Sequence, residues 1–442
     1  MNIKSRFYKF TMPILFLFPG IIFSVVFSHA QTAKFASPRQ EKLLNGMNLL
    51  VWNDPNAAKV SVKLRVHSGS AFDTQGKEGT MALLADALFP TDAAKEFFAE
   101  ELGGSLDVTS NYDYIQINAT ANSDQFLTML ETVANAVTNF QTDRETTANV
   151  RAARLEKVKE LEKNPSYIAD QMVAKRLFGD FPYGRPQKGT SESLAKIDFA
   201  DLTLAKQRFL TADNATLAVA GNVKPDLVYR AARRYFGAWT RADKKVPATF
   251  RQPDAPDAKE LSIEMANADK YSLRSAAIVA ARNDKDFYAT QILTGILQKQ
   301  FCLNNESHLG KSAYQPYLLR GLYVIKTDTV YGKEIESLPI NTGGCPTSPQ
   351  NRVKFNIPSI KQSDFDTVKK AVIYDFQGKA EKTWNLSEMW LDVDTYKLVS
   401  VKDEMSKLNN VTLADVRRVA EDLQKQPIVN VVVKKPESAK SN

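Results

Sequence analysis

The order of helices and strands predicted along this 442-residue chain occurs twice. Alternating apolar residues and helical periodicity predict one series between residues 49 and 239, and a similar series follows residue 259. The clearest likeness is a helix followed by a strand. One copy begins with Phe199-Ala-Asp-Leu and leads into the strand Thr216–Ala220; the other begins with Leu413-Ala-Asp-Val and leads into residues 428–433. Such a repeat indicates a tandem duplication of one folding unit.

A segment rich in proline and polar residues separates the two copies. Pro247, Pro253 and Pro256 fall within about ten residues of one another, among lysines and aspartates. This composition is typical of an interdomain linker. We therefore predict an α+β module over residues 31–243, a linker over 244–258 and a second module over 259–442.

The first thirty residues have the features of a secretory signal peptide. Lys4, Arg6 and Lys9 precede an apolar run from Met12 to Phe27, and Ser28-His29-Ala30 follows it. We predict cleavage after Ala30 and an exported protein, periplasmic or secreted. A retained membrane anchor is the alternative, because the run approaches the length that spans a bilayer. No later stretch is long and apolar enough, so no membrane span is expected after cleavage.

The net charge of +8 comes in part from the leader. Without its three basic residues, 55 lysines and arginines remain against 50 acidic residues. On the predicted helices these charges are interleaved, which is typical of a solvated surface and not of a groove that binds nucleic acid. No nucleic-acid partner is expected.

Residues that ligate zinc are scarce. The chain has three histidines, His29, His67 and His308, so a histidine-built centre would need nearly all of them together. We expect a structural role for His67 on its strand and a surface loop position for His308. The two cysteines, Cys302 and Cys345, are too few for a thiolate cluster. Export favours a disulfide between them, and two unpaired thiols are the alternative.

Several stretches together resemble the M16 (insulinase/pitrilysin) family of zinc metallopeptidases, which includes the mitochondrial processing peptidases. The resemblance covers the mature chain, densely in its first half. It implies two LuxS/M16-like α/β sandwich modules in tandem, each a mainly antiparallel sheet covered by helices. The matching stretches are Asn45-Gly-Met47 with Val60–Ser70, Gly79–Phe89, Glu101–Asp113, Tyr183–Thr190 and Asn214–Gly221.

The family's zinc motif, His-x-x-Glu-His, is replaced in this chain. Its spacing places two imidazole ligands and a general base on one face of a helix. The corresponding positions are Ala82, Ala85 and Asp86. The family's third ligand, a glutamate on a long helix, corresponds to Lys157, or to Glu156 if the register differs by one. A methyl group donates no lone pair and an ammonium repels a dication, so we expect no metal and no catalytic residue.

The resemblance also points to residues that bind peptide. The family's substrates add to the edge of a strand that corresponds here to residues 103–113, with Gly103, Gly104, Ser105 and Asp107 near its start. An ordinary sheet edge, protected by a partner, is the alternative. A tyrosine that grips the peptide corresponds to Tyr314, but Ser307 stands where the family has the accompanying arginine. Packing is the alternative role for Tyr314.

Three functions follow from these residues. The first is a non-catalytic subunit that pairs with a zinc-bearing M16 chain and helps bind an extended peptide or unfolded segment. The second is a stand-alone peptide-binding scaffold or chaperone. The third is a zinc peptidase with displaced ligands, which the histidine count disfavours.

Overall fold

The computed structural model describes residues 35–141, 143–243, 250, 253–302, 311–330, 357 and 359–436. All of them belong to one unit of the chain. The predicted signal peptide lies outside the described residues. The same holds for Ser307, His308 and Cys345, and the side chain of Cys302 is not described.

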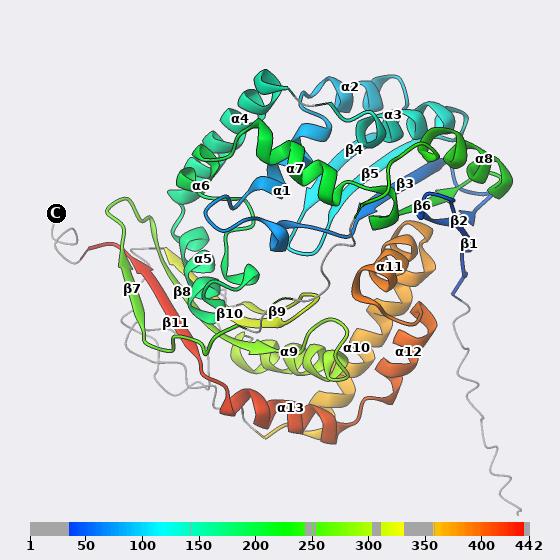
Figure 1. Ribbon diagram of the computed structural model, residues 1–442. Coiled ribbons are helices and arrows are strands. Elements are labelled where there is room, and N and C mark those ends of the chain that lie inside the picture. Colours follow the sequence, from blue (N-terminus) through cyan, green and yellow to red (C-terminus); the bar gives the residue numbers. More distant parts are fainter. Residues whose placement is uncertain are drawn as a thin grey trace, which may run out of the picture. The chain divides into compact units, whose positions relative to one another are not determined.

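The first half of the chain builds a six-stranded sheet in the order β1-β2-β6-β3-β5-β4 (Figure 1). In it β2 and β6 run parallel and the other neighbours antiparallel. The central strands β3 and β6 consist largely of valine, leucine and alanine, which pack well on a pleated surface. The strands are β1 (Arg39–Lys42), β2 (Asn48–Asn53), β3 (Lys59–Val66), β4 (Ser105–Ser110), β5 (Ile115–Asn122) and β6 (Ala215–Gly221).

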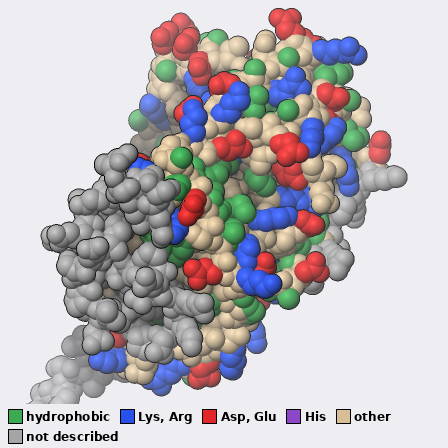
Figure 2. Space-filling model, turned by 90° about the vertical axis from the view of Figure 1, so that its left-hand side faces the viewer, with side chains coloured by type: hydrophobic (Ala, Val, Ile, Leu, Met, Phe, Trp, Pro, Cys, Tyr) green, Lys and Arg blue, Asp and Glu red, His purple; other side chains and the backbone are tan. Residues whose placement is uncertain are grey.

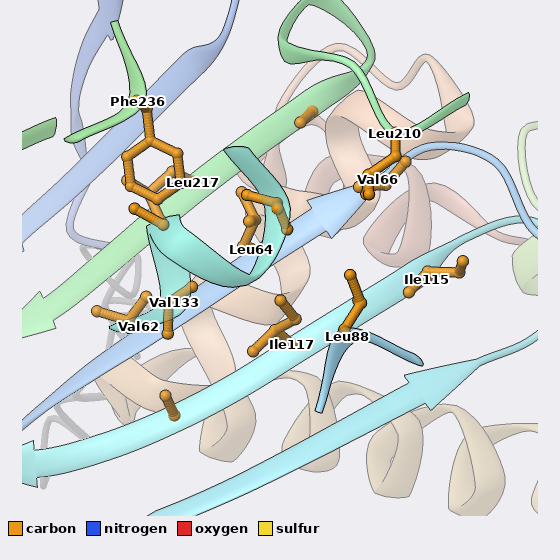
Figure 3. Close-up of a cluster of buried hydrophobic side chains, with 14 of the residues drawn as sticks. Val62, Leu64, Val66, Leu88, Ile115, Ile117, Val133, Leu210, Leu217 and Phe236 are labelled. Atoms are coloured by element: carbon orange, nitrogen blue, oxygen red, sulfur yellow. The ribbon is translucent and has the colours of Figure 1, made fainter. Parts of the chain in front are cut away.

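Helices of the same half cover one face of this sheet and enclose its main core (Figure 3). Val62 and Leu64 of β3 and Ile117 of β5 point into it, with Val133 of α3 and Phe236 of α8. The first half contains the helices α1 (Thr80–Leu88), α2 (Ala93–Glu100), α3 (Phe126–Thr138), α4 (Arg144–Glu162), α5 (Pro165–Phe178), α6 (Ser191–Ala195), α7 (Phe199–Phe209) and α8 (Pro225–Phe236), of which α5 packs elsewhere.

The second half builds a five-stranded sheet in the order β7-β11-β8-β10-β9. Within the described part, no helix combines the length and apolarity needed to cross a bilayer. The elements are β7 (Leu261–Glu264), β8 (Lys270–Val279), α9 (Phe287–Cys302), β9 (Lys311–Pro316), β10 (Gly321–Val330), α10 (Gln362–Glu381), α11 (Thr383–Tyr396), α12 (Val401–Asn410), α13 (Leu413–Lys425) and β11 (Val429–Lys434).

The two sheets repeat one topology. The order β2-β6-β3-β5-β4 corresponds strand for strand to β7-β11-β8-β10-β9. In both, the first pair is parallel and the others are antiparallel. The predicted tandem duplication of mainly antiparallel α/β modules is therefore confirmed.

Each half also supplies one helix to the sheet of the other half (Figure 1). Helix α5 packs on β8 and β11, and α11 packs on β6 and β3. These are equivalent helices of the duplicated unit, because each follows a long helix, α4 or α10, after a short break. Helices of its own half therefore cover one face of each sheet, and a helix of the other half covers part of the opposite face.

Two predicted elements are refined by the structure. Helical periodicity over residues 144–178 predicts a long helical stretch that Asn164-Pro165 interrupts, and the structure breaks there into α4 and α5, with the Asn164 side chain capping α5. The apolar run over residues 317–327 predicts one strand, but in the structure β10 starts at Gly321 and β9 lies before it. The apolar pattern is nearly continuous through the turn of this hairpin, so periodicity alone does not reveal it.

Candidate functional site

Helix α1 carries the positions that correspond to the zinc motif. The carboxylate of Asp73 caps the start of this helix, accepting hydrogen bonds from the backbone N–H groups of Gly79 and Met81, each at 2.8 Å. Ala82 and Ala85 are buried, and their methyl groups supply no ligand atom. Asp86, one helical step further, is one-third exposed. The structure thus brings the three positions onto one helix, as the spacing predicts.

Arg154 of α4 occupies the place opposite Asp86. Its Nε lies 2.7 Å from Oδ2 of Asp86 and its Nη2 lies 2.8 Å from Oδ1, which makes a bidentate ion pair. The same Nη2 also donates to the carbonyl oxygen of Ala82 at 3.3 Å. A guanidinium therefore joins the two helices that a bound metal would join in the family's active members.

The structure places Lys157, the residue that the sequence sets at the third ligand position, on the exposed surface of α4. Its neighbour Glu156 forms a surface ion pair with Lys159 at 2.9 Å. The residue that faces α1 is Arg154, nearly one helical turn earlier. Sequence spacing over a loop of unknown length does not fix which residue of a helix faces its neighbour.

The residues at this position do not fit a zinc ion. Both oxygens of Asp86 are engaged by Arg154, and a guanidinium repels a dication. No group of three or more histidine, cysteine, aspartate or glutamate side chains suited to a metal occurs among the residues that the structure describes.

His67 takes the structural role expected for it. Its Nε2 lies 2.9 Å from Oγ1 of Thr216, and its Nδ1 lies 3.1 Å from Oγ1 of Thr395 on α11. Burial lowers the pKa of His67 to about 3, so the ring is neutral near pH 7. Its two nitrogens are occupied by hydroxyl groups and not by a metal.

Strand β4, the predicted peptide-binding strand, forms an edge of the first sheet. It pairs with β5, and α1 packs against it. Gly103 has a φ of 63°, and a side chain on Gly104 would meet the carbonyl oxygen of Thr120. Ser105 and Asp107 are exposed, whereas Leu106 between them is buried. An open strand edge therefore lies beside the helix that carries Asp86.

Tyr314 lies in β9 of the second sheet and is engaged in packing. Its Oη donates to the carbonyl oxygen of Ala280 at 2.8 Å, and its ring lies 5.7 Å from that of Phe287. Burial raises the pKa of Tyr314 far above its usual range. The hydroxyl proton is therefore already used within the protein.

A buried polar contact between the halves was not found from the sequence. Arg65 of β3 is fully buried, donates to Oδ1 of Asp392 at 2.7 Å and also pairs with Glu388. Arg274 of β8, equally buried, has its Nε 2.5 Å from Oδ1 of Asp170 on α5. Because β3 and β8 are equivalent strands, the two arginines hold the two exchanged helices in the same way. The sequence feature that could have indicated this contact is the row of polar residues at alternate positions of β3.

Asp113 makes a second contact between the halves. Its Oδ1 accepts a hydrogen bond from the hydroxyl of Tyr183 at 2.8 Å, and its Oδ2 accepts one from the backbone N–H of Leu318 at 3.1 Å. Burial raises the pKa of Asp113 from 3.8 to about 6. This carboxyl group therefore changes its protonation within the range in which proteins are ordinarily handled.

The fold and this site define a duplicated α/β framework of the metallopeptidase type, with Ala82, Ala85 and Asp86 at the positions that correspond to the zinc motif. Family models agree: the one described as Insulinase (Peptidase family M16) matches residues 49–191, and the one described as Peptidase M16 inactive domain matches residues 196–316. The chain belongs to the M16 peptidase family. The second match runs across the predicted linker.

Individual proteins are similar to this chain in sequence or in structure. An uncharacterized zinc protease of Rickettsia bellii is 22% identical over 410 residues, which cover 89% of this chain and 96% of that protein. A protease from Helicobacter pylori has a similar structure, with a TM-score of 0.79, 16% identity and coverage of 90% and 100% of the two chains. A peptidase M16 inactive domain from Pseudomonas fluorescens has a TM-score of 0.74, 17% identity and coverage of 91% and 98%.

Proposed function

We propose that this chain is a non-catalytic M16 subunit that pairs with a zinc-bearing active chain and helps bind its peptide substrate. One observation supports the proposal: Asp86, which corresponds to a ligand position of the family's zinc motif, is engaged by Arg154 in a bidentate ion pair. An ion pair at that point joins α1 and α4 without any metal. The framework is thereby retained, while the nucleophilic water of a zinc peptidase has no ion to activate it.

The edge strand β4 supports a role in peptide binding. Adding a strand to a sheet edge uses backbone N–H and C=O groups, so it does not depend on zinc ligands. Ser105 and Asp107 on β4 are exposed beside this edge. The same edge supports the second candidate, a stand-alone peptide-binding scaffold or chaperone.

We propose further that the chain acts outside the cytoplasm, in the periplasm or as a secreted protein, because its first thirty residues have the pattern of a signal peptide. The partner chain would then be exported too. No nucleic acid takes part in this role.

Co-expression tests the pairing. The tagged mature chain would be expressed with an untagged M16 chain that carries His-x-x-Glu-His, taken from the neighbouring gene. We expect the two to co-purify and to cleave an unstructured peptide only together. A chain that stays monomeric and binds peptides alone would replace this function with the scaffold. Stoichiometric zinc in the purified chain, lost with peptidase activity on chelation, would replace it with the displaced-ligand peptidase.

A further inference from the structure

A small cavity of about 190 Å³ lies between α5 and the β9–β10 hairpin. Helix α5, which packs on β8 and β11, forms one side of this cavity. Val173 of α5 and Leu322 and Val324 of β10 give the cavity an apolar floor. Its volume is below the roughly 300–1,000 Å³ that holds drug-sized ligands, so it suits a group of the size of one side chain.

Three tyrosines close one side of the cavity. The rings of Tyr112, Tyr183 and Tyr317 lie 4.9–5.0 Å from one another. Each hydroxyl already has a partner: Tyr112 donates to backbone carbonyls, Tyr183 to Asp113, and Tyr317 to Gln315. This wall is therefore fixed. Since Tyr112 follows the last residue of β4 by two positions, the cavity lies at the end of the open strand edge.

Three polar side chains that line the cavity, one of them the exposed Lys188, have no protein partner within the described part of the chain. The hydroxyl of Tyr167, the amide of Gln171 and the ammonium of Lys188 make no hydrogen bond or ion pair with any residue in the described ranges. Asp170, in contrast, is engaged by Arg274 at 2.5 Å and by Lys326 at 3.0 Å. A lysine ammonium can only donate hydrogen bonds, and tyrosine and glutamine side chains can donate them as well. Together these groups suit a ligand that carries hydrogen-bond acceptors.

We infer that this cavity is a subsite for a carboxylate of the bound peptide. The aliphatic part of an acidic side chain, or of the last residue, lies on Leu322 and Val324, and its carboxylate accepts hydrogen bonds from Lys188 and Tyr167. The inference rests on the proposed function and deepens it, because it names the chemistry that the peptide must offer at the end of β4. Charge complementarity to the unpaired Lys188 ammonium favours a carboxylate over a neutral amide.

Three labelled peptides test the subsite on the mature chain by fluorescence anisotropy. Each has about ten residues of alanine, serine and threonine around one variable position. The first carries glutamate and a C-terminal amide, the second glutamine and a free C-terminal carboxylate, and the third glutamine and an amide. We expect one of the first two to bind about tenfold more tightly than the third, as one charge-assisted hydrogen bond provides. The tighter one identifies the source of the carboxylate.

Lys188→Gln should remove this preference, whereas Lys402→Gln, which changes an exposed lysine of α12, should retain it. Equal binding of the three peptides would overturn the subsite, as would a preference that survives Lys188→Gln or a failure of all three to bind. None of these results affects co-purification with an active chain, which tests the proposed function separately. A preference without any co-purifying partner would uphold the subsite and overturn the pairing.

Discussion

At the scale of single residues, the ion pair between Asp86 and Arg154 joins helices α1 and α4 of this M16 framework. The pair is bidentate and only one-third or less exposed at either side chain. Ala82 and Ala85 fill the adjacent space with methyl groups. Of the three motif positions, one is therefore an anion paired with a cation on α4, and the other two carry only methyl groups.

Restoring the metal site should require the loss of Arg154. A variant with Ala82→His, Ala85→Glu, Asp86→His and Arg154→Glu supplies three ligands and a base in the arrangement typical of catalytic zinc. We expect about one equivalent of zinc in the purified variant by elemental analysis. The matched variant that keeps Arg154 should bind none. Equal zinc in both variants, with unchanged circular dichroism, would show that the guanidinium does not stand at the metal position.

At the scale of elements, the two exchanged helices are each held by one buried arginine. Arg65 ties α11 to the first sheet, and Arg274 ties α5 to the second. Burying a guanidinium without partners is costly, and removing it leaves the facing carboxylates unpaired. These contacts therefore fix the position of each helix on the sheet of the other half.

Arg65→Met should destabilise the chain by about 3 kcal/mol, because Asp392 and Glu388 then lose their buried cation. Urea denaturation followed by tryptophan fluorescence measures the change. Arg39→Met, which breaks an exposed ion pair with Asp226, is the matched control and should give no resolvable loss. Similar stabilities for the two variants would contradict a structural role for the buried contact.

Much of the fold could be predicted from sequence, since periodicity located strand β3 and the repeat predicted the second sheet. The burial of the polar face of β3 could not be predicted. Lys63 and Arg65 alternate with valine and leucine, as on a strand with one solvated face. The helix that covers them lies 327 residues further along the chain, and no local pattern identifies such a partner. The same limit applies to Arg154, whose direction depends on how α4 is rotated against α1.

At the scale of the whole molecule, the contact between the halves should depend on pH. Asp113 has a folded-state pKa of about 6 against an ordinary value of 3.8. A carboxyl group with a raised folded-state pKa stabilises the fold at low pH, and this contribution is lost as pH rises through about 6. The shift corresponds to about 3 kcal/mol.

Comparison with Asp113→Asn isolates this effect. Between pH 4 and pH 7, where most of this contribution is lost, the free energy of unfolding of the wild type should fall by about 2 kcal/mol relative to that of the variant. Urea denaturation at a series of pH values measures the difference, and other titrating groups cancel because both proteins carry them. Parallel curves for the two proteins would show that Asp113 does not titrate between the folded and unfolded states.

The exchange of helices between the halves has a consequence for the order in which the chain is made. Synthesis completes all six strands of the first sheet by residue 221, but the helix that covers its second face ends only at Tyr396. Until then, the growing chain presents Lys63 and Arg65 to water. These charged groups keep the face that α11 later covers hydrated, and they disfavour its aggregation with other nascent chains. The first half thus reaches its final structure only when nearly the whole protein has been synthesised.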